Sequence, residues 1–543
     1  MDDTDHLPRK EKEKCSEVRI GNSLNESESQ HVANRRATVQ QCLQEHNIFC
    51  SVDEVPNIAL AATGGGERAM IGLLGSLSQL SEERLLDCIM YLGGDSGSTW
   101  CMASVYKEPD WSNQMETVKQ NIIKRLNQGK ITCSEQYKML AKMCEKDNFN
   151  VTDIWAIFIV SDIVKEIDDH VLTEQRGQNT NNPYPIYTVI DKKCKHNTLN
   201  RDTWFEITPH ECGYSQTGAF VDSKSFGSQF EKGAKTKEQP EIDMMYLQGL
   251  CGSALADVEE IRNRIQMKST FTTLQGPHME EGYQVLCNLL EMNISFHKGN
   301  DPSIYVTNMN ELLEGKHDKD GQKVKIEDSI TEETVKKHTL SVCHSFFDWF
   351  PELKDFWKVI VKCIEKVSQW DWGTKYNFLY KMKVDDVHPS VLKSEKRHYE
   401  DTGLLINSPY LSILRKERNV DLIISLDFNS GVQFETVDQA AQMCKDLQIP
   451  FPTVEHPENI EEPEDFYVFK DNPNAPVVIH MPLFNAMNCK GEVKMWENKY
   501  TTFQLAYSEE MISNHLEKAG LNIKNTKEKL LKEIEEVIQE KKN

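Results

Sequence analysis

Residues 94–98, with the sequence Gly-Asp-Ser-Gly-Ser, constrain the fold of this chain more than any other segment. They follow the apolar run 88–92 and precede a stretch through Tyr106 that is compatible with a helix. Glycines on both sides of a serine let the backbone turn sharply from a strand into a helix, which exposes the serine hydroxyl at the turn. The pattern therefore predicts a strand–turn–helix unit that presents Ser96 as a nucleophile.

The same order of elements occurs a short distance upstream. The apolar segment 57–62 is followed by Gly64-Gly65-Gly66 and then by a helical pattern. Free backbone N–H groups in such a glycine run can bind the negative charge of an oxyanion or a phosphate. Alternating strands and helices are typical of a parallel sheet covered by helices. The sequence therefore predicts an α/β fold, and the two glycine turns together indicate acyl-transfer chemistry.

The upstream glycines also allow a second interpretation. Gly64, Gly66 and Ala69 match a loose dinucleotide-binding fingerprint, with Asp87 about twenty residues further on. This fingerprint is weak alone, and nothing else in the sequence points to a nicotinamide or a flavin. A P-loop is excluded because no Gly-Lys-Ser or Gly-Lys-Thr follows the glycines. We therefore predict no cofactor.

The net charge of −23 excludes nucleic acid as an expected partner, because phosphate binding needs clustered lysine and arginine. The N-terminus is charged and lacks the apolar core of a signal peptide, and no apolar run is long enough to cross a bilayer. The 15 cysteines are scattered without a CxxC pair or zinc-finger spacing. These features predict a cytoplasmic protein with reduced cysteines and no metal site.

The chain is predicted to form one domain with a polar arm. Residues 1–36 have few aliphatic side chains and predict a mobile N-terminal arm, so the domain spans residues 37–543. The charged run at about 310–340 predicts an exposed insertion. The aromatic-rich segment 343–357 is expected to pack in a core or to form a cap, in preference to forming a surface that binds lipid. The apolar stripe 523–538 favours a helix packed on the body of the protein over one lying on a membrane.

A serine nucleophile needs a base, and sequence patterns alone leave this base unassigned. In ordinary α/β-hydrolases the histidine follows the serine and the acid along the chain. His456, His480 and His515 all occur late enough for this role. A histidine beside apolar residues, such as His480, is more often structural, so a catalytic triad stays open at this point.

Together, these segments and others further along the chain resemble the cytosolic (group IV) phospholipase A2 family, from about residue 50 to about residue 510. Residues 63–69 are similar to the family's Gly-Gly-Gly-x-Arg-Ala block, and residues 91–100 to its Gly-x-Ser-Gly-Ser-Thr-Trp turn. Further similar segments follow in the same order, at 204–210, 218–221, 252–255, 372–373, 377–380, 401–403, 407–409, 478–480 and 482–485. The resemblance implies a modified, patatin-like α/β-hydrolase fold with a helical cap over the active site.

The resemblance also implies a Ser–Asp dyad in place of a triad. Ser96 would be the nucleophile and Asp401 its base, because a carboxylate held close in a dry site can accept the serine proton directly. Gly65 and Gly66 match the family's oxyanion-hole glycines. Each backbone N–H that meets the developing charge is typically worth ~3 kcal/mol.

Two arginines match positions that the family uses for the substrate phosphate, namely Arg68 and Arg418. An arginine fork suits phosphate geometry better than a lysine does. The implied substrate is a glycerophospholipid or a lysophospholipid, whose acyl ester would be cleaved to release a fatty acid. Too few residues precede Val55 to fold a C2 domain, so none is expected, and catalysis is expected to be calcium-independent.

Near the nucleophile the sequence departs from the family pattern. Asp95 stands where relatives carry an apolar residue, and Glu67 is expected to compete with phosphate for Arg68. An ionised carboxylate about 6 Å from the oxyanion would repel it by ~3 kcal/mol at an effective dielectric constant of 20. Turnover would then slow on the order of a hundredfold. The alternative function is therefore a catalytically weakened paralogue that binds lipid or protein.

The end of the chain departs from relatives that carry a prenylation box. Residues 539–543 contain no cysteine, and the N-terminal Met-Asp excludes myristoylation. A lipid anchor is therefore not expected. Contact with a phospholipid surface is expected to be transient.

Overall fold

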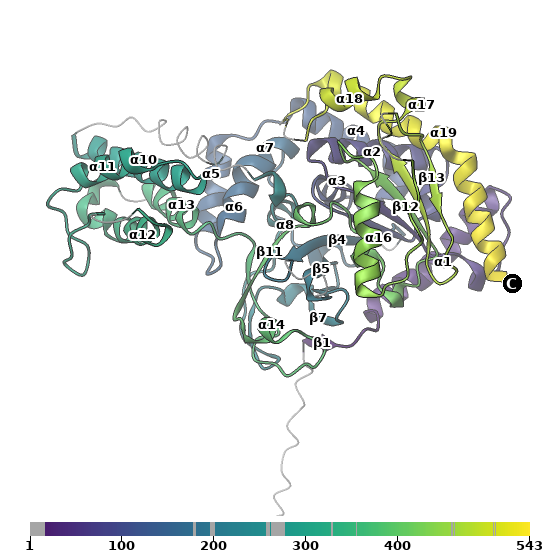
Figure 1. Cartoon of the computed structure of the whole chain (residues 1–543), viewed down its shortest axis with the longest axis horizontal. Helices are drawn as coiled ribbons and strands as arrows, with labels where there is room; N and C mark the ends of the chain where they lie inside the picture. Colours follow the sequence, from purple (N-terminus) through teal and green to yellow (C-terminus); the bar gives the residue numbers. More distant parts are fainter. Residues whose placement is uncertain are drawn as a thin grey trace, which may run out of the picture.

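The computed structural model describes residues 17–177, 181–195, 201–256, 261, 277–326, 330–353, 356–457, 460, 462–502, 504 and 506–542. A mixed β-sheet occupies the centre of the main body (Figure 1), with the strand order β1–β7–β6–β5–β4–β3–β2–β12–β14–β13. Five neighbouring strands in its middle are parallel, namely β4 (Tyr184–Asp191), β3 (Tyr91–Gly94), β2 (Ile58–Ala62), β12 (Leu422–Asp427) and β14 (Val477–Pro482). The predicted parallel α/β core is confirmed.

The other strands extend the sheet in antiparallel fashion. On one side lie β5 (Trp204–Ile207), β6 (Glu211–Tyr214), β7 (Ala219–Asp222) and β1 (Val18–Ile20), and on the other lies β13 (Tyr467–Phe469). A branch is formed by β11 (Lys396–Asp401), which pairs with β4, and by β10 (Thr374–Tyr376), which pairs with β11. A separate hairpin consists of β8 (Gln229–Glu231) and β9 (Ala234–Lys237).

Helices cover the sheet, and the longest of them is C-terminal. Helix α19 (Glu509–Lys542) packs along α2 (Glu67–Glu82), and its apolar stripe is buried, including Ile523, Leu530 and Ile538. The prediction that segment 523–538 packs on the body is confirmed. The remaining helices of the body are α1 (Glu26–Glu45), α3 (Gly97–Val105), α4 (Met115–Gln128), α5 (Cys133–Met143), α6 (Val151–Trp155), α7 (Ser161–Val164), α8 (Met244–Cys251), α14 (Pro389–Lys393), α15 (Tyr410–Ile413), α16 (Glu435–Leu447), α17 (Ala486–Cys489) and α18 (Val493–Lys499).

Four helices form a lobe at one end of the molecule (Figure 1), namely α10 (Pro277–His297), α11 (Ser303–Leu312), α12 (Glu332–Trp349) and α13 (Phe356–Gln369). The aromatic-rich segment supplies its interior, since Phe346, Phe350 and Trp357 are buried. This agrees with the core-or-cap interpretation of that segment.

The charged run at 310–340 is not a separate insertion. Its ends belong to α11 and α12, and Val324 and Ile326 between them are buried. Residues 327–329 lie outside the described ranges. The charged residues therefore belong to the segment that connects α11 and α12 within the helical lobe.

The predicted N-terminal arm is wrong for its second half. Strand β1 pairs with β7, and α1 begins at Glu26 with Asn25 as its N-cap. Polar composition was misleading because two charged residues of α1, Glu28 and Arg35, are buried. Residues 1–16 lie outside the described part of the chain.

Candidate active site

Ser96 occupies the predicted turn between β3 and α3, and its φ of 46° is in the left-handed region. This conformation is strained for a residue other than glycine and is typical of a nucleophile turn. Only glycine fits at position 97, because a Cβ there would lie 1.9 Å from the carbonyl oxygen of Gly66. The two glycine turns are therefore packed against each other.

Gly65 and Gly66 follow β2, which is parallel to and paired with β3, so both turns lie at the carboxyl edge of these strands. A Cβ on Gly64 would lie 2.6 Å from the Ser96 Cβ, which shows how closely the loop approaches the nucleophile. Among the described residues, no acceptor takes a hydrogen bond from the backbone N–H of Gly65 or Gly66. Both groups can therefore donate to an anionic oxygen beside Ser96.

Sheet pairing brings Asp401 to the same place. Strand β3 ends where Gly94 pairs with Tyr187 of β4. The antiparallel strand β11 then takes up pairing with β4, and its last residue, Asp401, pairs with Val189. At these positions β5 pairs with one side of β4. Strand β11 therefore pairs with the other side, the one along which β3 has already ended. Asp401 therefore meets the turn that follows β3.

The Asp401 carboxyl group is fully buried and firmly oriented. Its Oδ1 accepts a hydrogen bond from the Gly403 N–H at 2.8 Å, and its Oδ2 accepts one from the Ala254 N–H at 3.0 Å. Burial raises the pKa of Asp401 to about 6, although these donors and the Ser96 hydroxyl act in the opposite direction. A carboxylate with a pKa near neutrality is a suitable general base.

No histidine is placed to act as the base within the described part of the chain. His456 bonds to Asp438 at 2.9 Å, His480 bonds to the carbonyl oxygen of Gln433, and His515 bonds to that of Arg68. None of the three lines the cavity at Ser96. The triad that the sequence left open is therefore not formed.

Ser96 lies at a cavity of about 360 Å³. The wall includes both glycine turns and polar side chains, and its members are Gly65, Ser96, Ala254, Gly403, Leu404, Leu405, Asn407, Asn429, Glu435, Thr436, Gln439 and Thr502. No residue of the lobe α10–α13 is among them, so the lobe as described does not cover this cavity. Ser96 and Gly65 open into the cavity, and the buried Asp401 lies against the Ser96 turn, which is an arrangement for ester cleavage.

Comparisons with known proteins identify relatives of this chain. A family model described as a lysophospholipase catalytic domain matches residues 58–339. Cytosolic phospholipase A2 gamma from mouse is 33% identical over 95% of this chain and 91% of its own length, and the human protein is 33% identical over 96% of both chains. This chain belongs to the cytosolic phospholipase A2 family. Human GIVD cytosolic phospholipase A2 has the same fold, with a TM-score of 0.68 and 21% identity over 97% of this chain and 69% of that chain.

Asp95 departs from the cytosolic phospholipase A2 pattern, but its surroundings are not those of a charged residue. The side chain is fully buried, and neither carboxyl oxygen has a well-formed hydrogen bond within the described chain. Burial and the neighbouring Asp401 carboxylate raise the pKa of Asp95 well above its ordinary value. An uncharged Asp95 does not repel an oxyanion, so the main reason for expecting a weakened paralogue is removed.

Glu67 does not compete for Arg68. Its carboxylate accepts a hydrogen bond from the backbone N–H of Tyr507 at 2.9 Å, and burial raises its pKa to about 7. The Arg68 guanidinium donates to other acceptors. The competition that the sequence suggested is therefore absent.

Arg68 lies beside the cavity but does not open into it. Its guanidinium is fully buried and donates to the carbonyl oxygens of Phe428 at 2.7 Å and Tyr500 at 2.6 Å, and to the Thr502 Oγ1 at 2.8 Å. Thr502 lines the cavity. The expected direct contact with phosphate is not found in this conformation, because all three guanidinium nitrogens already donate hydrogen bonds within the protein.

Arg418 lies far from Ser96. It precedes β12 and its guanidinium lies 5.6 Å from the ring of Tyr91, at the amino edge of the strands whose carboxyl edge carries Ser96. A six-residue strand at about 3.3 Å per residue separates these edges by roughly 20 Å. The prediction that Arg418 contacts the substrate phosphate is therefore wrong.

The role of Arg418 is electrostatic and structural. It donates to Glu28 at 2.8 Å and to Glu206 at 2.9 Å, with all three side chains fully buried. Glu28, Glu206 and Glu211 form the one group of possible metal ligands among the described residues. Although burial alone would raise it, Arg415 and Arg418 lower the pKa of Glu206 to about 2. The negative charges of these three glutamates are therefore paired with the positive charges of Arg19, Arg415 and Arg418.

Replacing Arg418 with alanine should lower the free energy of unfolding by about 3–5 kcal/mol, because the buried Glu28 loses the arginine that it pairs with and the buried Glu206 keeps only Arg415. Urea unfolding measures this change. The control is Arg84→Ala, whose exposed pair with Glu45 at 3.6 Å should contribute only about 0–1 kcal/mol. Unchanged stability with a raised KM for phospholipid would instead restore a substrate-binding role.

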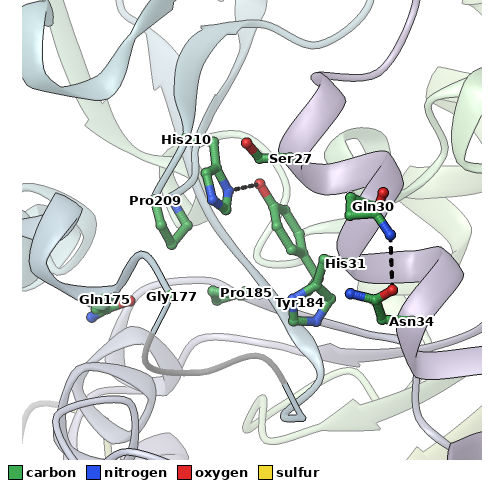
Figure 2. A pocket seen from close by; sticks show the side chains of 10 residues that line it. All are labelled: Ser27, Gln30, His31, Asn34, Gln175, Gly177, Tyr184, Pro185, Pro209 and His210. Atoms are coloured by element: carbon green, nitrogen blue, oxygen red, sulfur yellow. Dashed lines mark hydrogen bonds between the residues drawn. The ribbon is translucent and has the colours of Figure 1, made fainter.

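A second cavity, of about 200 Å³, lies at the amino edge of the sheet, where Tyr184 begins β4 (Figure 2). His31 and His210 face it, and His210 is hydrogen-bonded to the Tyr184 hydroxyl at 2.9 Å. Burial lowers the pKa of both histidines to about 4. No hydrogen bond joins Ser27 to either ring within the described chain, so this cavity holds no activated nucleophile.

Two residues that orient the base were missed by the sequence analysis. Gly403 had a local signal, since Asp-x-Gly commonly forms a turn in which the aspartate bonds the N–H two residues on. Ala254 had no such signal, because its N–H reaches Asp401 only through the folding of α8 against β11.

Proposed function

We propose that this protein hydrolyses the acyl esters of glycerophospholipids and lysophospholipids, with Ser96 as the nucleophile and Asp401 as its base. One observation carries the proposal: the buried Asp401 meets the Ser96 turn, and Ser96 lines a cavity together with Gly65 of the glycine loop. Its membership of the cytosolic phospholipase A2 family supports an ester of this class.

Acylation starts when Asp401 takes the proton of the Ser96 hydroxyl. The Ser96 oxygen then attacks the ester carbonyl, and the negative charge that develops on the carbonyl oxygen is met by the N–H groups of Gly65 and Gly66. Such donors are worth about 3 kcal/mol each when they are positioned in advance. The tetrahedral intermediate collapses, and Asp401 returns the proton to the leaving alcohol, which is lysophospholipid or glycerophosphodiester.

Deacylation reverses these roles with water in place of the alcohol. Asp401 takes a proton from the water, and the hydroxide attacks the acyl-enzyme. Fatty acid leaves, and Ser96 recovers its proton. Since N–H donors meet the oxyanion and a carboxylate moves the proton, the proposed reaction requires no calcium ion and no cofactor.

Arg68 and the cavity rim define how the lipid would be held. By fixing Thr502 and Phe428, Arg68 is proposed to shape the wall that the headgroup meets. Leu404 in the cavity wall is 46% exposed, and Val432 is 67% exposed near the lining residue Asn429. These apolar side chains suit a transient contact with a phospholipid surface. No helix of the described chain is long and apolar enough to cross a membrane.

Fatty-acid release from mixed phospholipid–detergent micelles, in the presence of a calcium chelator, tests the proposal. We expect release by the wild type and its loss in Ser96→Ala. A long-chain fluorophosphonate offers a second test, since human GIVD cytosolic phospholipase A2 has been solved with methyl gamma-linolenyl fluorophosphonate. Mass spectrometry should find one adduct, on Ser96. Absence of both release and adduct would refute the proposal.

A further inference from the structure

Two carboxyl groups lie side by side beneath the nucleophile, those of Asp95 and Asp401. Both side chains are fully buried. Their hydrogen bonding differs. Each oxygen of Asp401 accepts a well-formed hydrogen bond from a backbone N–H, of Gly403 or Ala254. The oxygens of Asp95 have no well-formed hydrogen bond in the described chain, although the Thr402 hydroxyl and the Ser96 N–H approach them.

Two ionised carboxylates in contact are not stable in a buried site, so the pair retains one proton. Hydrogen bonds from N–H groups favour the ionised form, and Asp401 has two of them. Asp95 is approached by the Thr402 hydroxyl and the Ser96 N–H, neither with good geometry, and burial together with the Asp401 carboxylate outweighs them and raises the pKa of Asp95. The proton therefore belongs on Asp95 in the resting enzyme, and the negative charge belongs on Asp401.

We propose that Asp95 is a positioning residue that stays protonated and donates a hydrogen bond to the Asp401 carboxylate, so that it sets the lower pH limit for activation of Ser96. This inference rests on the proposed Ser96–Asp401 dyad. During acylation the Ser96 proton passes to Asp401, while Asp95 keeps its own proton throughout. A carboxylic acid thus replaces the apolar residue of relatives without adding a charge.

The other groups that face the pair do not take over this role. The Thr402 hydroxyl approaches Asp95 and acts to lower the pKa of Asp95, but burial and the Asp401 carboxylate outweigh this effect. The thiol of Cys251 on α8 is kept protonated because burial raises its pKa. Glu435 is the one acidic residue among the described residues of the cavity wall, and no lysine, arginine or histidine belongs to that wall. Besides Ser96, Asp95 is a side chain whose hydrogen bond acts to lower the pKa of Asp401.

The pH dependence of Ser96 reactivity distinguishes this arrangement from an ionised Asp95. The hydrogen bond from Asp95 stabilises ionised Asp401. Asp95→Leu removes it and should shift the acidic limb of log(kcat/KM) upward by about one to two pH units. Asp95→Asn retains an N–H donor of similar shape and should keep the limb close to that of the wild type. If Asp95 were ionised, both variants would shift the acidic limb to lower pH, because Asp401 would lose a neighbouring negative charge that disfavours its own ionisation.

The experiment measures the rate of fluorophosphonate labelling of Ser96 and the kcat/KM for micellar phospholipid from pH 4.5 to 9, in roughly half-unit steps, for the wild type and both variants. An upward shift in Asp95→Leu with little shift in Asp95→Asn supports the proposal. A downward shift in either variant, no shift in Asp95→Leu, or equal upward shifts in both would overturn it. Failure of the dyad itself has a different signature, namely labelling of Asp401→Asn at the wild-type rate.

Infrared spectroscopy tests the resting proton directly and does not depend on turnover. The wild-type minus Asp95→Asn difference spectrum at neutral pH should contain the C=O stretch of a protonated carboxylic acid. A carboxylate band in its place would overturn the proposal. Thermal unfolding of each variant establishes that the folded proteins are being compared.

Discussion

Replacing Ser96 with alanine should reduce kcat/KM for phospholipid by ~10⁴-fold or more, because the acyl-enzyme can no longer form. The N–H groups of Gly65 and Gly66 stay in place, so a small residual rate from oxyanion binding is expected. Fatty-acid release from mixed micelles with a calcium chelator provides the measurement, and stability should change little because Ser96 is a small residue at a turn.

The matched control is Ser104→Ala, at the far end of the same helix. Ser104 donates a hydrogen bond to the Trp100 carbonyl oxygen, within α3, and should affect activity by no more than about threefold. If Ser96→Ala retained more than about 1% of wild-type activity, a nucleophile other than Ser96 would have to be sought.

Replacing Asp401 with asparagine should reduce kcat/KM by about 10³–10⁴-fold, because an amide keeps the shape of the side chain but cannot accept the Ser96 proton. The amide also places its own N–H₂ against one of the two backbone donors, Gly403 or Ala254. Asp438→Asn is a suitable control, since Asp438 pairs with His456 and is not one of the residues that line the cavity. Near-normal activity in Asp401→Asn would remove Asp401 from the mechanism.

The wild-type pH profile follows from the same residue. Asp401 must be ionised to act as a base, and its pKa is about 6. Above that pH the carboxylate form dominates and the rate should be maximal. Below it, kcat/KM should fall by about tenfold for each pH unit as Asp401 becomes protonated. A profile that stays flat down to pH 4.5 would contradict this assignment.

The local turns of the catalytic centre could be predicted from the sequence because their determinants are local. A glycine on each side of Ser96, and three consecutive glycines after an apolar strand, permit few backbone conformations. The parallel sheet followed from the order of apolar runs and helical patterns. Asp401 could be assigned only by resemblance, since no local pattern connects it to Ser96.

The errors concerned charged residues that are buried. The segment that carries Glu28 looked like a solvated arm, and Arg418 looked like a phosphate ligand. In the fold each is the other's partner, held at 2.8 Å across the sheet edge. Composition describes how polar a segment is, but it does not tell which opposite charge a distant segment brings to it.

The sequence by itself determined that Ser96 stands on a strained turn and that glycine N–H groups lie ready beside it, because these features depend on residues close together in the chain. Only the tertiary structure decided which base serves Ser96, since β11 must pair with β4 beyond the end of β3 before Asp401 can reach the turn. It also decided the charge of Asp95. Ionisation depends on burial and on neighbouring carboxylates, and both arise only when the chain is folded.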